Sequence, residues 1–227
     1  MAEKLSKEFV LHRGELEEKL GVSLNHTLQG YDIVLPLRDL REIDHIAFFK
    51  QEALTALIRK IPLRNKAEGE VIYPYGEAKI EVYGVEPRGL AVGQTFVHQS
   101  KLLGIMQHLT GVFSLYVTKG ISKMPPVQVY GKTASGEKSM SFYIPPFVER
   151  HGTLNVLLDG MHRSYLCMSA GTTINAVHIS NITASLPFDP ISWEKVSVVE
   201  EKPPIPERYV HLQPAYFRDL GVVGIDG

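Results

Sequence analysis

The stretch Leu154-Asn155-Val156-Leu157-Leu158-Asp159-Gly160-Met161-His162-Arg163 decides the fold of this chain. An apolar run leads into Asp159-Gly160-Met161-His162-Arg163, and a segment with helical character follows as far as Gly171. The pattern predicts a strand that turns at a small residue into a helix. The first N–H groups of such a helix point at one spot, where the positive end of the helix dipole also lies. The stretch therefore predicts an anion site, most often one for phosphate.

Each residue after the strand has an expected task. Gly160 allows a tight turn and a close approach of a ligand to the backbone. Asp159 could cap the helix, orient His162, act as a base, or bind magnesium. His162 and Arg163 supply charge-assisted donors to an anion, and Arg163 can hold phosphate with two bonds. Ser164 adds a hydroxyl in the same turn. The structural alternatives are a salt bridge for Arg163 and a hydrogen bond that holds the turn for His162.

The composition is that of a folded globular protein. The chain has 227 residues, of which 44% are hydrophobic and 22% charged, with a formal net charge of −1. Such a charge does not favour a broad surface for DNA, RNA or anionic membrane, although it allows a local basic patch. The sequence shows no membrane span and no signal-peptide pattern, so we expect a cytoplasmic protein with no membrane partner. The single cysteine, Cys167, excludes an intramolecular disulfide and a cysteine-rich zinc site, and we expect no transition-metal site.

Hydrophobic periodicity indicates a mixture of helices and strands, hence an α+β or α/β fold. The predicted helices cover residues 4–20, 44–60 and 99–109, in addition to the one that follows Gly160. In the second, Asp44 is expected to cap the start and Pro62 to stop the pattern. Extended segments are predicted at residues 71–73, 80–83, 126–130, 140–144 and 174–179. The last forty residues are rich in proline and are expected to form an extended arm packed on the core.

Two stretches resemble the ParB/sulfiredoxin superfamily. The first is Leu158 to Arg163 followed by Ala170-Gly171 and a strand, which is similar to the family pattern of strand, D/G-G-x-H-R, helix, Gly and strand. The second is Gly120-Ile121-Ser122-Lys123-Met124-Pro125-Pro126-Val127-Gln128-Val129, which resembles the family's G-I-x-x-P-I-x-V segment. The resemblance covers roughly residues 99–182. It implies an α+β fold with a ParB/sulfiredoxin-like mixed sheet at 99–185, an N-terminal α+β extension at 1–98, and the arm at 186–227.

The resemblance also implies a function. Members of this superfamily bind ATP, ADP or CTP at the motif, so Gly160, Met161, His162 and Arg163 would hold the nucleotide phosphates. Met161 stands where sulfiredoxins have their reactive cysteine, which excludes their thiol chemistry at this position. No helix-turn-helix of the ParB type follows the motif, which weakens the expectation of DNA partition.

The leading hypothesis is a nucleotide-binding protein that transfers or hydrolyses phosphoryl groups. Asp159 and His162 would be catalytic, Gly160 to Ser164 would bind phosphate, and Mg²⁺ would assist. Whether the chain is an enzyme stays open at this point. The alternatives are a DNA-associated, partition-like binding module without enzymatic activity and a ParB-like nuclease. A homodimer is compatible with every one of these hypotheses.

Overall fold

The computed structural model describes residues 9–24, 28–64, 70–112 and 123–225. The chain forms two compact units, which are described separately. Unit 1 consists of Met1–Pro62, Pro126–Ile144 and Arg218–Gly227, and unit 2 of Leu63–Pro125 and Pro145–Phe217. These boundaries differ from the division at residues 98 and 185, which stays a prediction.

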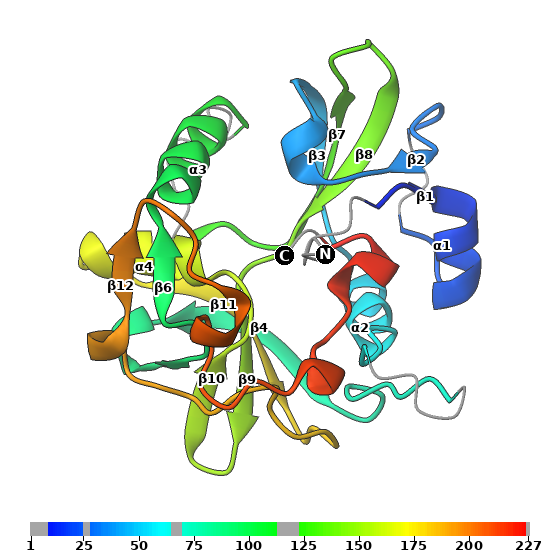
Figure 1. Cartoon of the computed structure of the whole chain (residues 1–227). Helices are drawn as coiled ribbons and strands as arrows, with labels where there is room; N and C mark the ends of the chain where they lie inside the picture. The colour runs from blue at the N-terminus through cyan, green and yellow to red at the C-terminus, as the bar shows by residue number, and fades with distance from the viewer. Residues whose placement is uncertain (1–8, 25–27, 65–69, 113–122, 226–227) are drawn as a thin grey trace. The chain divides into compact units, whose positions relative to one another are not determined.

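Unit 1 is built on a five-stranded mixed sheet (Figure 1). Its strands, in spatial order, are β1 (Leu11–His12), β2 (Ile33–Val34), β8 (Lys138–Tyr143), β7 (Val127–Lys132) and β3 (Glu42–Phe48). β7 and β8 form an antiparallel hairpin, with Val127 opposite Tyr143. The helices of this unit are α1 (Arg13–Leu20) and α2 (Gln51–Arg59). Short 3₁₀ turns occur at Leu37–Asp39 and Leu220–Val223.

The predicted helix at residues 44–60 is wrong in its first half. Residues Glu42–Phe48 form β3, which pairs with β7, and the helix begins only after Lys50. Asp44 does not cap a helix; its Oδ2 accepts a hydrogen bond of 2.8 Å from the Tyr31 hydroxyl. Pairing with a neighbouring strand has overridden the helical spacing of the apolar residues.

The predicted helix at residues 4–20 is present in its second half. α1 ends as expected, because Gly21 adopts the left-handed conformation with φ of 69°. At the other end, Leu11–His12 form a strand instead of helix. Residues 4–8 of the prediction lie outside the described residues.

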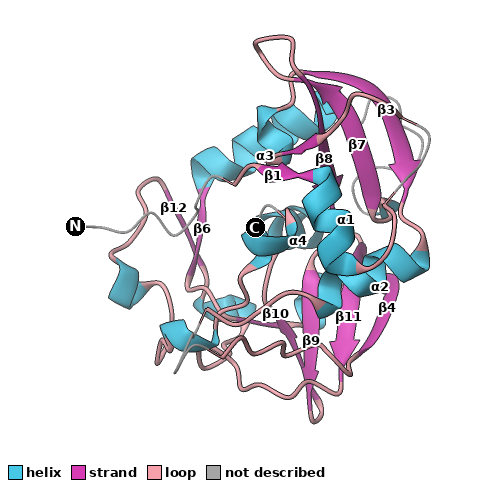
Figure 2. Ribbon diagram, turned by 90° about the vertical axis from the view of Figure 1, so that its right-hand side faces the viewer, coloured by secondary structure: helices cyan, strands magenta, loops and turns pink. Residues whose placement is uncertain are grey.

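Unit 2 contains a second five-stranded mixed sheet and a separate parallel pair of strands (Figure 2). The sheet has the order β4 (Lys79–Val85), β11 (Ile174–Ser180), β9 (Phe147–His151), β10 (Leu154–Leu157) and β5 (Ala91–Val92). The pair consists of β6 (Phe96–His98) and β12 (Ser197–Val199). The helices are α3 (Gln99–Val112) and α4 (Met161–Ser169). Single 3₁₀ turns lie at Pro87–Gly89, Trp193–Lys195, Ile205–Glu207 and Pro214–Tyr216.

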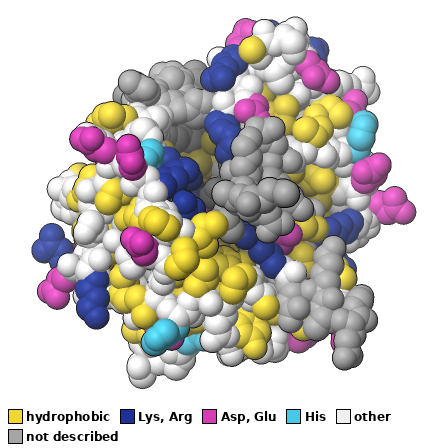
Figure 3. All heavy atoms as spheres, in the orientation of Figure 1, with side chains coloured by type: hydrophobic (Ala, Val, Ile, Leu, Met, Phe, Trp, Pro, Cys, Tyr) yellow, Lys and Arg dark blue, Asp and Glu magenta, His cyan; other side chains and the backbone are white. Residues whose placement is uncertain are grey.

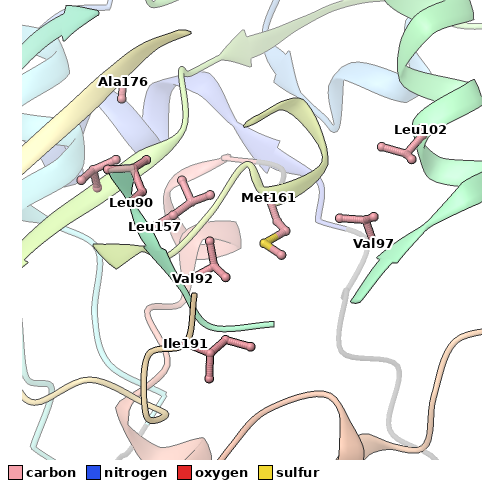
Figure 4. Packing of buried hydrophobic residues seen from close by; sticks show 9 residues of the cluster. Leu90, Val92, Val97, Leu102, Leu157, Met161, Ala176 and Ile191 are labelled. Carbon is pink, nitrogen blue, oxygen red and sulfur yellow. The ribbon is translucent and has the colours of Figure 1, made fainter. Parts of the chain in front are cut away.

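A cluster of buried apolar side chains joins the sheet of unit 2 to the start of α4 (Figure 4). Its members are Leu90, Val92, Val97, Leu102, Val148, Leu157, Met161, Ala176 and Ile191. Ile191 comes from the proline-rich arm, and its backbone pairs with that of Val92. Removal of a Val, Leu, Ile or Met side chain from water stabilises the fold by about 1.5–3 kcal/mol. The cluster thus fixes where α4 begins.

The prediction of an α+β fold is confirmed. The second of the two stretches that carry the ParB/sulfiredoxin resemblance is divided between the units. Pro126 to Val129 belong to unit 1, whereas the part up to Pro125 belongs to unit 2, as does the first stretch from Asp159 to Gly171. Residues 113–122, which include part of the second stretch, lie outside the described residues. Across the described ranges, no helix combines the length and apolar character needed to cross a membrane.

Candidate anion site at the start of helix α4

The predicted strand, turn and helix are present. β10 ends at Leu157, Gly160 has φ of 82° at the N-cap position, and α4 starts at Met161. A Cβ on Gly160 would lie 2.6 Å from Cγ of Pro146, which is too close for any side chain. Glycine is therefore required here both for its backbone conformation and for the space beside Pro146.

The side chains of Met161 and Ser164 do not face a ligand. Met161 is only 7% exposed and belongs to the apolar cluster of unit 2. Ser164 is 0% exposed, and its Oγ has no hydrogen-bond partner among the described residues. Together with the buried Cys167, they form the buried side of α4. Met161 can contribute only its backbone N–H to an anion site, and the hydroxyl expected from Ser164 is not presented there.

Asp159 and Arg163 form an ion pair. Nη2 of Arg163 donates to Oδ2 of Asp159 at 3.3 Å, and the two side chains are 15% and 16% exposed, respectively. Asp159 does not cap the helix with its side chain, since the N-cap residue is Gly160. The salt bridge considered from the sequence is thus present, and it places the guanidinium and a carboxylate beside the first turn of α4.

His162 joins α4 to a second helix start. Its Nε2 accepts a hydrogen bond of 3.0 Å from the backbone N–H of His98. His98 is the last residue of β6, and α3 follows directly at Gln99. The first turns of α3 and α4 are thereby held together (Figure 1). Each turn has N–H groups without an intrahelical acceptor, so two helix N-termini meet at one place.

His162 is neutral near pH 7. Burial is the largest cause that lowers the pKa of His162 from 6.5 to about 4. Positive charge nearby lowers this pKa further, and the contributing side chains are Lys101, His98, Lys202 and Arg163. Because Nε2 accepts the His98 N–H, the imidazole proton is on Nδ1. The expectation that His162 supplies positive charge is therefore corrected: it can donate one neutral hydrogen bond from Nδ1.

The surroundings of His162 are nevertheless electropositive. Lys101 lies in the first turn of α3, and Lys202 follows β12, which is paired in parallel with β6. Neither lysine was predicted from the sequence. Lys101 follows Phe96-Val97-His98, an apolar strand that runs straight into a helix, so the pattern found at Gly160 could have indicated it. Lys202 has no local signal, because only the pairing of β12 with β6 brings it close.

Within the described part of the chain, no three or more His, Cys, Asp or Glu side chains are grouped so that they could hold a metal ion. Comparison of the chain with protein-family models, with curated proteins and with solved structures gives no match.

Proposed function

We propose that the chain is a nucleotide-binding protein of the ParB/sulfiredoxin type, which holds the phosphates of ATP, ADP or CTP at the start of α4. The observation that carries the proposal is the hydrogen bond between the His98 N–H and Nε2 of His162. This bond places two helix N-termini in one electropositive neighbourhood. Backbone amides and cations arranged in this way are typical of phosphate sites.

The groups available for phosphate differ in kind. The N–H groups of Met161, His162 and Arg163 belong to the first turn of α4 and have no intrahelical acceptor. The guanidinium of Arg163 provides a charged donor, and Nδ1 of His162 provides a neutral one. Lys101 and Lys202 add positive charge that neutralises a polyphosphate.

Phosphoryl transfer or hydrolysis is the reaction that we propose for the site. Its catalysis depends mainly on position and electrostatic stabilisation, and the cations around His162 provide that stabilisation. Asp159 fits a magnesium ion, because one of its oxygens accepts from Arg163 while the other makes no hydrogen bond to a described residue. Mg²⁺ is commonly held by one or two carboxylates together with substrate phosphates, whose charge it neutralises. Asp159 would also accept the proton of an attacking hydroxyl or water.

Calorimetric titration with ATP, ADP and CTP tests the binding proposal. We expect saturable binding of at least one nucleotide and a loss of roughly tenfold or more in Arg163→Ala, since a charged hydrogen bond to phosphate contributes about 1.5–3 kcal/mol. Arg41→Ala is the matched control, because Arg41 is an exposed arginine of unit 1. Failure of every nucleotide to bind the folded protein would overturn the proposal.

Turnover is tested separately. Asp159→Asn should abolish magnesium-dependent release of phosphate while nucleotide binding without magnesium is retained. If wild-type protein binds nucleotide but releases no phosphate, the enzymatic part fails and the binding part stands.

DNA binding is the alternative function. Among the described side chains that Figure 3 colours, both Lys and Arg and Asp and Glu are present on the face shown. The net charge of −1 does not favour a broad surface for DNA. A gel-shift titration at two salt concentrations measures DNA binding directly. A DNA complex that is lost steeply as salt is added would favour this alternative function.

A further inference from the structure

A second polar region of unit 2 lies at the opposite end of β10. It is a surface hollow with a volume of about 530 Å³, lined by Arg150, His151, Gly152, Ser180, Asn181 and Ile182. The volume falls in the range of small-molecule sites. The hollow lies where β9 and β11, which are parallel neighbours, both end. Polar groups that follow parallel strands meet at one sheet edge, a common place for ligands.

This hollow is separate from the site at α4. The turn at Gly152 precedes β10, whereas Asp159 and Gly160 follow it. Since a strand rises about 3.3 Å per residue, the four steps from Leu154 to Leu158 separate the two ends by about 13 Å. A ligand in the hollow is therefore independent of the proposed nucleotide site.

A buried carboxylate orients the histidine of the hollow. Glu149 is 0% exposed, and it accepts hydrogen bonds from the Tyr75 hydroxyl and from Nε2 of His151, the latter at 2.7 Å. Because a carboxylate only accepts, the His151 proton is on Nε2. The side chain of His151 is 25% exposed, and its Nδ1 makes no hydrogen bond to a described residue. A carboxylate behind an imidazole fixes its tautomer and the orientation of its ring.

The hollow offers unused donors and positive charge. Nε of Arg150 donates to the carbonyl of Gly152 at 3.2 Å, which holds the guanidinium over the turn. Its two Nη groups make no hydrogen bond to a described residue. Asn181 has φ of 61°, a conformation that costs energy in residues other than glycine and is concentrated at functional sites. Among the described residues that line the hollow there is no Asp or Glu, and Glu149 itself is buried.

We propose that this hollow is a second ligand site, which takes a small molecule bearing a carboxylate or phosphate. Arg150 binds the oxyanion through its Nη groups, and Nδ1 of His151 accepts a hydrogen bond from a neighbouring hydroxyl or protonated group of the ligand. Ser180 and Asn181 contribute a hydroxyl and an amide. Glu149 and Tyr75 are positioning residues, because they act through His151.

Amide NMR spectra of the full chain test the proposal, with inorganic phosphate and succinate as probes. The experiment uses Arg163→Ala protein, so that binding at α4 is weakened. We expect saturable shifts of the Gly152 and Asn181 amides with at least one probe. Shifts with phosphate alone identify a phosphate ligand, and shifts with succinate alone a carboxylate. The response should disappear in Arg150→Ala and persist in Lys79→Ala, since Lys79 is an exposed cation paired with Ser180 that does not line the hollow.

Absence of these shifts with both probes, or shifts that survive Arg150→Ala, would overturn the proposal. The positioning role has its own readout in the imidazole ¹⁵N shifts. Wild-type His151 should show a protonated Nε2 and an unprotonated Nδ1, whereas Glu149→Gln should show a changed tautomer and weaker probe binding. Tyr75→Phe supplies a milder variant if Glu149→Gln does not fold, and an unchanged tautomer and affinity in it would contradict the positioning role of Tyr75.

Discussion

The backbone N–H of His98 donates a hydrogen bond of 3.0 Å to Nε2 of His162, across 64 residues of sequence. The bond connects the strand that leads into α3 with the first turn of α4. The bond requires a neutral imidazole, because a protonated Nε2 could not accept the amide proton, and burial supplies that state by lowering the pKa of His162 to about 4. His162 therefore has two tasks: it holds two helix starts together and leaves Nδ1 as a donor toward a ligand.

Replacement of His162 should weaken unit 2. His162→Ala leaves the partly buried His98 N–H without its partner, and the full penalty for an unsatisfied buried donor is about 1–3 kcal/mol in the free energy of unfolding. Urea unfolding followed by the fluorescence of Trp193, the single tryptophan of the chain, reports on this unit. The control is His211→Ala. The His211 side chain is 78% exposed, so its removal should change the free energy of unfolding by less than about 0.5 kcal/mol. Equal effects of the two changes would show that the bond contributes nothing.

A comparison of the two glycines that flank α4 tests the tight turn. Gly160 and Gly171 both have positive φ, but only Gly160 would place a Cβ against Pro146, since Gly171 has open space around it. Gly171→Ala should cost about 1–2 kcal/mol for the left-handed backbone alone. Gly160→Ala should cost roughly 1–3 kcal/mol more, because of overpacking. Urea unfolding of the two variants measures this difference. Similar losses in the free energy of unfolding for Gly160→Ala and Gly171→Ala would refute the role given to Pro146.

Lys202 should contribute to nucleotide affinity although the motif does not contain it. Its charge reaches His162, so Lys202→Ala should weaken ATP binding roughly threefold to tenfold at low salt, an effect of about 1 kcal/mol. Lys195→Ala is the control, since Lys195 is an exposed lysine of the same arm that does not act on His162. The gap between the two variants should narrow as salt is added. If calorimetry shows that both variants bind ATP as tightly as the wild type, Lys202 does not contribute to the site.

Stability should fall as the pH drops from 7 to 5. His178 is 8% exposed, its Nε2 has no hydrogen-bond partner among the described residues, and its ring stacks on Tyr83 at 3.6 Å. Burial lowers the pKa of His178 to about 4, against the opposing charge of Glu81. The unfolded chain, with a pKa near 6.5, binds more protons in this range, so the free energy of unfolding should decrease by about 2 kcal/mol.

His178→Phe keeps a ring against Tyr83 and removes this titration. Urea unfolding at pH 7 and pH 5 should therefore show a smaller pH dependence in the variant. Part of the dependence should remain, since the pKa of His162 is lowered in the same sense. An identical slope in both proteins would contradict the account of His178.

The sequence predicted the features whose cause is local. The apolar run before Asp159 and the freedom of Gly160 were sufficient for the strand, the turn and the start of α4. Contacts between residues far apart in the sequence could not be predicted. The Tyr75 hydroxyl, for example, donates a hydrogen bond to Glu149, which is 74 residues away. The helix expected over 44–60 failed at β3 for the same reason, since its partner β7 lies far along the chain.

The directions of the side chains within the site could not be predicted from the sequence either. The motif could not show that Met161 and Ser164 face the apolar cluster while His162 meets β6. On a helix, residues three apart share a face, so placing Met161 in the core also places Ser164 there. The core position of Met161, however, depends on Val92, Val97 and Ile191, which only the folded chain brings together.

The most direct test of the central claim is an amide NMR titration of the full chain with ATP. The two helix starts form one anion site in this account, so the amides of Met161, His162 and Arg163 should shift along the same binding curve as those of Gln99, Ser100 and Lys101. A titration to saturation that leaves both sets unchanged, or that moves only one of them, would contradict it.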